Sequence, residues 1–486
     1  MKSKNKNNTI DYFNNLFQQS SDISIEEHRL INDKKTESVL VVYCEGLTET
    51  DLLMNSILPG IQRTYYLHGL QGLENQKDSN SLKWSNRANA QINKTIQDKV
   101  FDGYTVIFIA DTVYFYNTSN PPKRTPEEST TEVSVKGPRD AFIEDIGSNI
   151  ALVRKRLKTD SFVTKSFTIG RRSNTKVSLV YLTDIQNDQM IQEVTERLNN
   201  IDLDALISDN QLGELLGDSR YALFPLMESV SRPDGVVSSL VRGRFAIFID
   251  NVPNVIVGPA NLGVLMNTSE DAHMPYYFAS FEMLLRIAGL LLAIFLPSFW
   301  VALSAYNVDQ IPFPLLATIG ASRLGIPFNT TVELLLMLGL FELFREAGVR
   351  LPKAVGQTVA VVGGLIVGDA AIRAGLTSPT MLVISSITAV ATFTLGNQSL
   401  FGTVTILRIF SILCAAVLGM YGFFVSLFFV VAYLAKLESF GIPYLSPVSP
   451  FVKQDIFKAL FKLPVTSDKM RAKILRTQDS DRQGEK

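Results

Sequence analysis

Ionisable side chains inside an otherwise apolar stretch are the residues of this chain best able to do chemistry. Five of them interrupt the sequence TVELLLMLGLFELFREAGVRLP, residues 331–352, namely Glu333, Glu342, Arg345, Glu346 and Arg350. A charged side chain at the centre of a bilayer costs at least about 2.5 kcal/mol, so such groups normally face protein, water or a partner charge. Arg345 lies within one helical turn of Glu342 and Glu346 and can pair with them. Two interpretations stay open: a membrane-crossing helix with paired charges, or an amphipathic helix in the membrane interface.

Small residues at regular spacing form the second motif, within residues 354–373. They recur at every fourth position, as Gly356, Ala360, Gly364 and Gly368. On a membrane helix this spacing makes one small-residue face, which lets another backbone approach closely. Asp369 and Arg373 lie one turn apart near its end and can neutralise each other. These residues alone favour close packing within a bundle over a pore lining.

Residues typical of catalysis or metal binding are scarce. The three histidines, His28, His68 and His273, have no second ligand type nearby at metal-like spacing. There is no phosphate-binding loop, no G-x-S-x-G and no H-E-x-x-H motif. The formal net charge of −1 gives no basic footprint for nucleic acid. We therefore expect no enzyme activity, no metal, no cofactor and no nucleic-acid partner.

These motifs fall in the second half of the chain, whose composition indicates a membrane domain over residues 281–436. Residues 287–308 and 409–435 contain no charged side chain and are each long enough to cross a bilayer as one helix. Residues 378–395 and 354–373 are further candidate spans, while the three prolines within 311–330 favour a re-entrant or interfacial segment. The expected architecture is an all-α transmembrane bundle of four to five helices.

The first half indicates a water-soluble α+β domain made of two α/β lobes, residues 36–120 and 159–280. Each lobe contains a strand-like stretch, a helix-like stretch and a hairpin; the strand-like stretches are residues 39–46 and 177–184, and the hairpins are 103–117 and 243–259. The likeness of the two lobes is explained equally well by an internal duplication and by chance similarity.

A loop and a connecting helix are expected between the lobes, over residues 121–158. Beyond Pro138, apolar residues recur at spacings of three and four, which predicts a helix with one apolar face. This face either docks on a partner or packs against the chain's own lobes. The candidate assembly surface comprises Gly137, Pro138, Arg139, Phe142, Glu144, Asp145, Asn149 and Arg154.

Both ends of the chain are expected in the cytosol. The first thirty residues contain no apolar core of signal-peptide length, and residues 1–35 read as a variable arm. The tail, residues 437–486, is rich in lysine and arginine, which marks the cytoplasmic side of a membrane. Two cytosolic ends require an even number of complete crossings.

Several long segments resemble the A subunit of the GerA family of spore germinant receptors. They are KGPRDAFIEDIGSNIALVRKR, FPLMESVSRPDGVVSSLVRGRFAIFIDNVP, FELFREAGVRLPKAVGQTVAVVGGLIVGDAAI, LRIFSILCAAVLGMYG and FGIPYLSPVSP. The resemblance implies a nutrient receptor of the spore inner membrane, with both termini on the spore core side. It also implies a permease-like B subunit, a lipoprotein C subunit, and an A subunit that oligomerises and conducts ions.

Under this resemblance, the small-residue stripe is expected to pack a symmetric assembly or to line its pore. Glu333, Glu342 and Asp369 would then shape a cation path, since acidic rings favour cations. Two other classes stay open, a membrane scaffold without conduction and a secondary transporter. A transporter should show an inverted repeat between membrane halves, and the sequence shows none. The nutrient and the oligomer number do not follow from the sequence.

Overall fold

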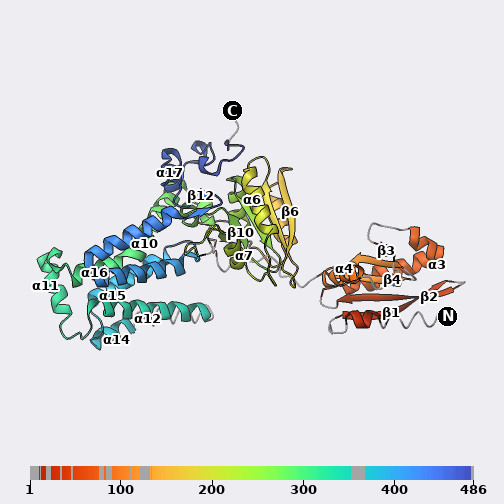
Figure 1. The fold of residues 1–486 in the computed structure, drawn as a ribbon, viewed down its shortest axis with the longest axis horizontal. Coiled ribbons are helices and arrows are strands. Elements are labelled where there is room, and N and C mark those ends of the chain that lie inside the picture. Colours follow the sequence, from red (N-terminus) through yellow and green to blue (C-terminus); the bar gives the residue numbers. More distant parts are fainter. Residues whose placement is uncertain are drawn as a thin grey trace. The chain divides into compact units, whose positions relative to one another are not determined.

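The computed structural model describes residues 10–482 apart from 11, 18–22, 33–34, 45–46, 76–80, 84–89, 110–111, 121–131, 133, 220 and 352–366. The chain forms two compact units, residues 1–124 and residues 125–486 (Figure 1). The first unit contains the first lobe. The second unit contains the second lobe, the helical bundle and the C-terminal tail.

The first unit is an antiparallel sheet with helices on both faces. Its strands follow the order β1 (Ile23–Asn32), β2 (Lys35–Cys44), β4 (Tyr104–Ile109), β5 (Thr112–Asn117) and β3 (Ser81–Lys83). Its helices are α2 (Thr50–Leu52), the π-helical turn η1 (Leu53–Ile57), α3 (Leu58–Asn75) and α4 (Ala90–Phe101). Because side chains alternate along β2, Val39 and Val41 pack with α3, whereas Leu40 and Val42 pack with α4.

The second lobe is also an antiparallel sheet covered on both faces. Its strands follow the order β6 (Phe162–Ile169), β7 (Thr175–Leu182), β9 (Phe245–Ile249), β10 (Val255–Gly258) and β8 (Glu228–Val230). One face carries α6 (Asp188–Asn199) and α7 (Asp209–Leu216). The other carries α5 (Ile146–Arg156) and α8 (Pro233–Val241).

Both lobes connect their strands in the same way. Within each sheet, the strands lie in the order first, second, fourth, fifth and third along the chain. The two predicted α/β lobes are therefore present, and their shared topology supports the duplication hypothesis. The edge strands β1 and β6 were not predicted; β1 falls within the arm expected over residues 1–35, and its polar sequence ISIEEHRLIN is typical of an edge strand.

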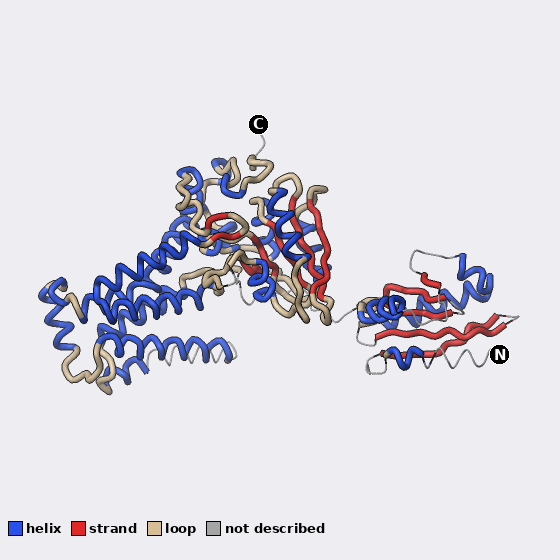
Figure 2. The backbone as a smooth tube through the Cα atoms, in the orientation of Figure 1, coloured by secondary structure: helices blue, strands red, loops and turns tan. Residues whose placement is uncertain are grey.

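The apolar half consists of helices that run side by side (Figure 2). They are α10 (Tyr276–Ala305), α11 (Phe313–Ser322), α12 (Thr330–Arg350), α14 (Gly368–Arg373), α15 (Pro379–Phe393) and α16 (Leu400–Lys436). In the described part of the chain, α10 and α16 are long and apolar enough to cross a membrane. The ten-residue helix α11 occupies the segment expected to be re-entrant or interfacial.

Helix α16 is a hairpin of two helical arms, so the prediction of one straight span over residues 409–435 is wrong. Gly419 has φ +62°, and the helix is interrupted there. The hydroxyls of Ser411 and Ser426 lie 2.8 Å apart, whereas residues fifteen positions apart on a straight helix are separated by about 22 Å. At the open end, Leu223 accepts a hydrogen bond from Thr403 and donates one to Tyr433. An apolar run of this length does not distinguish one span from two closely packed arms.

The contacts between helices define two ends of the bundle. We call the end where α10 begins proximal and the end where it finishes distal. Tyr306, just after α10, contacts Gly419, so the tip of the α16 hairpin is distal. Helix α12 runs back, since Leu334 packs near Val301 while the Arg345 guanidinium lies 5.8 Å from the Phe401 ring centroid.

The C-terminal tail packs against the second lobe. It forms the small hairpin β11 (Glu438–Ser439) and β12 (Ile442–Pro443), helix α17 (Lys453–Leu460) and the 3-10 turns η5 (Val465–Ser467) and η6 (Lys473–Leu475). Phe440, Ile442 and Leu475 belong to the same core as the strands β7 and β9. The Phe440 ring meets Phe245 edge-on, with centroids 5.2 Å apart. The lobe core is therefore completed by residues that follow the apolar helices.

Candidate functional site

Glu333 forms a fully buried cluster at the distal end of the bundle. Its Oε1 atom accepts hydrogen bonds from the Ser378 N–H at 2.5 Å, the Ser378 hydroxyl at 2.6 Å and the Thr377 hydroxyl at 3.2 Å. The Arg323 guanidinium lies 3.7 Å from Oε2. Through Oε1 the carboxylate thus joins the start of α12 to the start of α15, whereas Oε2 has the Arg323 charge nearby but no hydrogen-bond partner among the described residues.

A second charged cluster lies near the proximal end of the bundle. Arg345 forms an ion pair with Glu342 on α12, and Arg408 of α16 is buried beside them. These three residues line a cavity of about 230 Å³ together with Ser386 and Thr392 of α15. Arg408 donates to the Thr405 hydroxyl at 3.2 Å, while its Nε has no hydrogen-bond partner among the described residues. Three helices therefore place polar groups around one space inside an apolar bundle.

The other charges predicted in this half form exposed pairs within single helices. Glu346 lies 2.6 Å from Arg350 on α12. Asp369 lies 2.8 Å from Arg373 on α14. The pairing expected for Asp369 is present, whereas Glu346 pairs with Arg350 rather than with Arg345. Exposed pairs of this kind contribute little stability.

The small-residue stripe falls mostly outside the described residues. Gly356, Ala360 and Gly364 lie in the segment that is not described. Gly368 is buried at the start of α14, where Leu382 is the nearest side chain to the position that a Cβ would take. Pore lining and assembly by the stripe remain predictions.

The connecting helix packs against the sheet of its own lobe. Helix α5 begins at Ile146, later than the start expected just after Pro138, because the Asp145 carboxylate caps it by accepting from the Ser148 N–H at 2.8 Å. Phe142 lies before the helix, and its ring meets Phe248 of β9 edge-on at a centroid distance of 5.7 Å. The regular spacing of apolar residues thus runs through two different structures: the non-helical segment that contains Phe142, and helix α5.

The candidate assembly surface is divided between the interior and the exterior of the second unit. Phe142 and Asn149 are buried, and the Asn149 amide bonds the backbone N–H and carbonyl of Ile143 at 2.9 and 2.5 Å. Arg139, Glu144 and Arg154 are exposed. Arg154 also covers the Phe162 ring, 4.4 Å from its centroid.

Gly137 and Pro138 lie at the base of the loop that reaches the 3-10 turn η2 (Ser269–His273). Gly137 packs so closely on Arg232 and His273 that a Cβ there would clash with both side chains. Pro138 is half-buried. These two residues therefore contact the chain's own second lobe.

Turn η2 also anchors the first long apolar helix. Asp271 accepts hydrogen bonds from the Arg286 guanidinium of α10 at 2.6 and 2.8 Å. Glu282, one helical turn before Arg286, adds a contact of 3.3 Å. On the other side, the Lys462 ammonium donates to the carbonyls of Asp271, Ala272 and Met274. One turn thus holds both α10 and the C-terminal tail.

The neighbouring carboxylate of η2 holds the loop before α5. Glu270 accepts hydrogen bonds from the Lys136 N–H at 2.6 Å, the Ser134 hydroxyl at 3.2 Å and the buried Arg232 guanidinium at 3.1 Å. Burial alone would raise the pKa of Glu270, but these donors hold it below its ordinary value. Arg232 also binds Asp234, with the closer nitrogen–oxygen distance 2.6 Å. The charged side chains around η2 are consequently paired with one another.

The sequence did not indicate η2 or its contact with Arg286. Asp271 lies fifteen residues before Arg286 and Lys462 far beyond it, so no local spacing relates them. Among the described residues, no group of three or more His, Cys, Asp or Glu is placed to hold a metal ion.

The fold and its buried charge clusters define a membrane-associated protein in which a two-lobed α/β region precedes an apolar helical bundle. The chain belongs to the Bacillus/Clostridium GerA spore germination protein family, whose sequence model matches residues 11–474.

Two relatives and one solved structure illustrate this family. Spore germination protein XA of Bacillus anthracis is 39% identical over 474 residues, which is 96% of this chain and 95% of that protein. The uncharacterized membrane protein YfkQ of Bacillus subtilis is 35% identical over 426 residues, 87% of this chain and 82% of that protein. The N-terminal domain of the A subunit of the Bacillus megaterium germinant receptor GerK3 is 26% identical, over 52% of this chain and 93% of that one, with a TM-score of 0.22.

Proposed function

We propose that this protein is the A subunit of a nutrient germinant receptor in the spore inner membrane, and that it oligomerises to form a nutrient-gated cation channel. The observation that carries the proposal is the largely apolar cavity that the charged residues Glu342, Arg345 and Arg408 border, which lies inside the bundle of a germination-family protein. Polar residues in membrane segments are costly and mark ion pathways or packing sites. A permease-like B subunit and a lipoprotein C subunit complete the proposed complex.

The directions of the helices support a topology with both termini on one side of the membrane. In the described residues, α10 runs from proximal to distal, α12 returns, α15 returns again, and the arms of α16 run out and back. Because α10 begins at the proximal end and the second arm of α16 finishes there, the proposed number of crossings is even, as two cytosolic ends require.

Turn η2 supports a route from the soluble lobe to the bundle. The Asp271–Arg286 pair joins η2 directly to α10, and Glu270 joins η2 to the loop before α5. A change of position in the second lobe therefore reaches the first membrane helix through charged contacts. Switching of this kind requires a bistable element that both sites bias.

Substitution of the small-residue stripe tests the pore. Spores that carry this chain with its B and C subunits as their sole nutrient receptor are exposed to mixed amino acids, sugars and nucleosides, and potassium release is recorded. We expect A360L with G364L to abolish release, because leucine fills the small-residue face. Unchanged release with normal receptor levels would contradict the assignment of the stripe. Leucine at the exposed position Val417 is a matched control in the same bundle.

A membrane scaffold without conduction is the second candidate. It is favoured by the pairing of Glu333 and Glu342 with arginines, which leaves these carboxylates without the free charge of an acidic ring. A scaffold would assemble the receptor while the complete reconstituted complex carried no current. A secondary transporter is a weaker alternative, since no inverted repeat is visible in the membrane sequence.

A further inference from the structure

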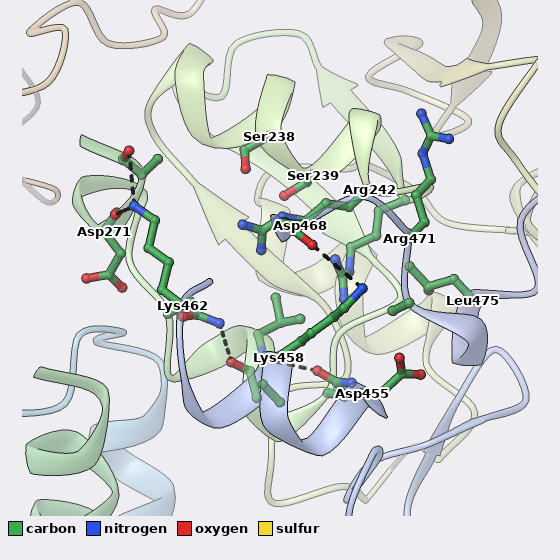
Figure 3. A pocket seen from close by; sticks show the side chains of 18 of the residues that line it. Ser238, Ser239, Arg242, Asp271, Asp455, Lys458, Lys462, Asp468, Arg471 and Leu475 are labelled. Carbon is green, nitrogen blue, oxygen red and sulfur yellow. Dashed lines mark hydrogen bonds and ion pairs between the residues drawn. The ribbon is translucent and has the colours of Figure 1, made fainter. Parts of the chain in front are cut away.

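A polar cavity of about 250 Å³ lies where the second lobe, the first turns of α10 and the C-terminal tail meet (Figure 3). Its lining includes Ser238 and Ser239 of α8, Lys458 of α17, and Ala279 and Met283 of α10. Figure 3 shows the side chain of Arg242 between the serines of α8 and the lysines of the tail. Three parts of the second unit therefore border one partly open cavity.

Most of the charged groups around this cavity are already paired. Lys462 is bound by three carbonyls, and Asp271 is bound by Arg286. Lys458 and Arg482 both lie against Asp468. Arg471 donates to the Val241 carbonyl at 2.9 Å and pairs with Asp479 at 2.7 Å. Asp455 accepts from the Lys473 N–H at 3.1 Å. These contacts attach the tail to the lobe and leave few charges for a ligand.

Two arginines lack a carboxylate partner. Arg242 has no hydrogen bond from its guanidinium and no ion pair within 4.0 Å among the described residues. Arg244 uses its Nε to donate to the Pro259 carbonyl at 3.1 Å and has no ion pair there either. Burial lowers the pKa of both, to about 10 for Arg244. The Arg242 side chain is nonetheless exposed to solvent, because the cavity that it lines is partly open.

One carboxyl group that acts on both arginines is largely neutral at neutral pH. Burial raises the pKa of Glu228 to about 8, although Arg244 and Arg242 oppose the shift. Glu228 is therefore largely protonated at pH 7, and it faces the cavity as a hydrogen-bond donor and acceptor. Two guanidinium groups without an ion-paired carboxylate and one neutral carboxyl group consequently face the same space, while Asp468 and Asp271 act on Arg242 from beyond ion-pair distance.

An orphan hydroxyl gives an independent indication of a ligand. Ser446, on the tail side of the cavity, is only 2% exposed, and its Oγ has no hydrogen-bond partner. Buried polar groups are nearly always paired, so such an atom calls for a partner that is not protein. A water molecule would satisfy the hydroxyl, but it would not offset two guanidinium charges.

We propose that this cavity binds a small oxyanion, a phosphate or carboxylate group, between Arg242, Arg244 and Ser446. Guanidinium groups bind such anions through paired, charge-assisted hydrogen bonds. The same chemistry is offered by a soluble anion and by the phosphate of an anionic lipid headgroup, which could approach along α10. In either case the bound anion joins the lobe to the tail beside α10 and stabilises that arrangement.

Binding of inorganic phosphate in detergent, and of lipid headgroups in nanodiscs, tests the proposal on the full-length protein. The purified chain in detergent is titrated with phosphate at constant ionic strength, with chloride as the reference, and binding is followed by calorimetry and by the thermal midpoint. Parallel samples in nanodiscs contain phosphatidylglycerol or phosphatidylcholine. Stabilisation by phosphate in detergent identifies a soluble ligand, and stabilisation only by phosphatidylglycerol identifies a headgroup. Either result supports the site; no effect of either anion overturns it.

The variant R242Q locates the binding. Arg242 is accessible, so its substitution should leave the unliganded thermal midpoint near that of the wild type while reducing affinity for the effective anion at least tenfold. R172Q is the matched control, because Arg172 lies on the surface of the same lobe and pairs with Asp204. Equal affinity in R242Q and R172Q would overturn the assignment of the cavity.

Discussion

Asp271 and Arg286 join turn η2 to helix α10 through two hydrogen bonds of 2.6 and 2.8 Å. Both side chains are about nine-tenths buried. Because η2 also holds Lys462 of the tail and, through Glu270, the loop before α5, this pair stands between the second lobe and the bundle. Its position suggests that it transmits force as well as stabilising the junction.

Breaking this pair should uncouple the lobe from the bundle. We expect D271N and R286Q each to reduce nutrient-triggered potassium release severalfold, because either change leaves a nearly buried charge without its partner. The double variant should be no worse than the worse single variant. The measurement is a double-mutant cycle on release rates at matched receptor levels. Additive effects would show that the two side chains act independently.

The α16 hairpin predicts a cross-link that a straight helix forbids. In a chain whose natural Cys44 and Cys414 are replaced by serine and alanine, S411C and S426C should form a disulfide on mild oxidation, because the two hydroxyls lie 2.8 Å apart. Mass spectrometry of the peptides measures the yield. S411C with F428C is the control, since Phe428 is exposed on the bundle surface. Absence of the Ser411–Ser426 cross-link would restore a single long span.

Glu333 should be needed for the stability of the bundle. E333A removes the acceptor of three hydrogen bonds and leaves the buried Ser378 N–H unpaired, which costs about 1–3 kcal/mol. E333Q retains an acceptor oxygen and should be milder. E346A, which breaks the exposed pair with Arg350, should change stability by at most about 1 kcal/mol. Denaturation in detergent compares the three, and equal effects of E333A and E346A would refute this role.

The raised pKa of Glu228 makes stability depend on pH. An unfolded glutamate ionises near pH 4.3, whereas burial raises the pKa of the folded Glu228 to about 8; Glu132 adds to this shift, and Arg244 and Arg242 oppose it. The contribution of Glu228 is therefore full below the unfolded pKa and is lost progressively as the pH rises to about 8. The thermal midpoint of E228Q minus that of the wild type should increase from pH 5 to 8 and stay constant above pH 8. A difference that does not change with pH would show that Glu228 has an ordinary pKa.

The sequence allowed the two lobes and the apolar bundle to be predicted because apolar strands and charge-free helices have strong local patterns. It did not indicate β1, whose exposed edge position needs no apolar alternation. It also did not indicate the turn at Gly419, since a 27-residue apolar run fits one long helix equally well. The basic tail suggested only a membrane side, and its packing through Phe440 depends on contacts far apart in the chain.

The contacts of the candidate site also fall into those that the sequence predicts and those that it does not. Pairs within one turn, such as Asp369 with Arg373, follow from spacing alone. Contacts between distant segments, such as Glu333 with Ser378 or Asp271 with Arg286, depend on the fold and left no local signal. No local motif relates Arg408 to Glu342, although the two residues line one cavity.

Electrical recording of the assembled receptor tests directly whether it conducts ions. The purified chain with its B and C subunits is reconstituted in a planar bilayer, and current is measured before and after addition of mixed nutrients. We predict a nutrient-dependent current carried by potassium in preference to chloride and absent from the A360L and G364L double variant. A complex that is fully assembled and carries no current under any nutrient would contradict the channel and leave the scaffold.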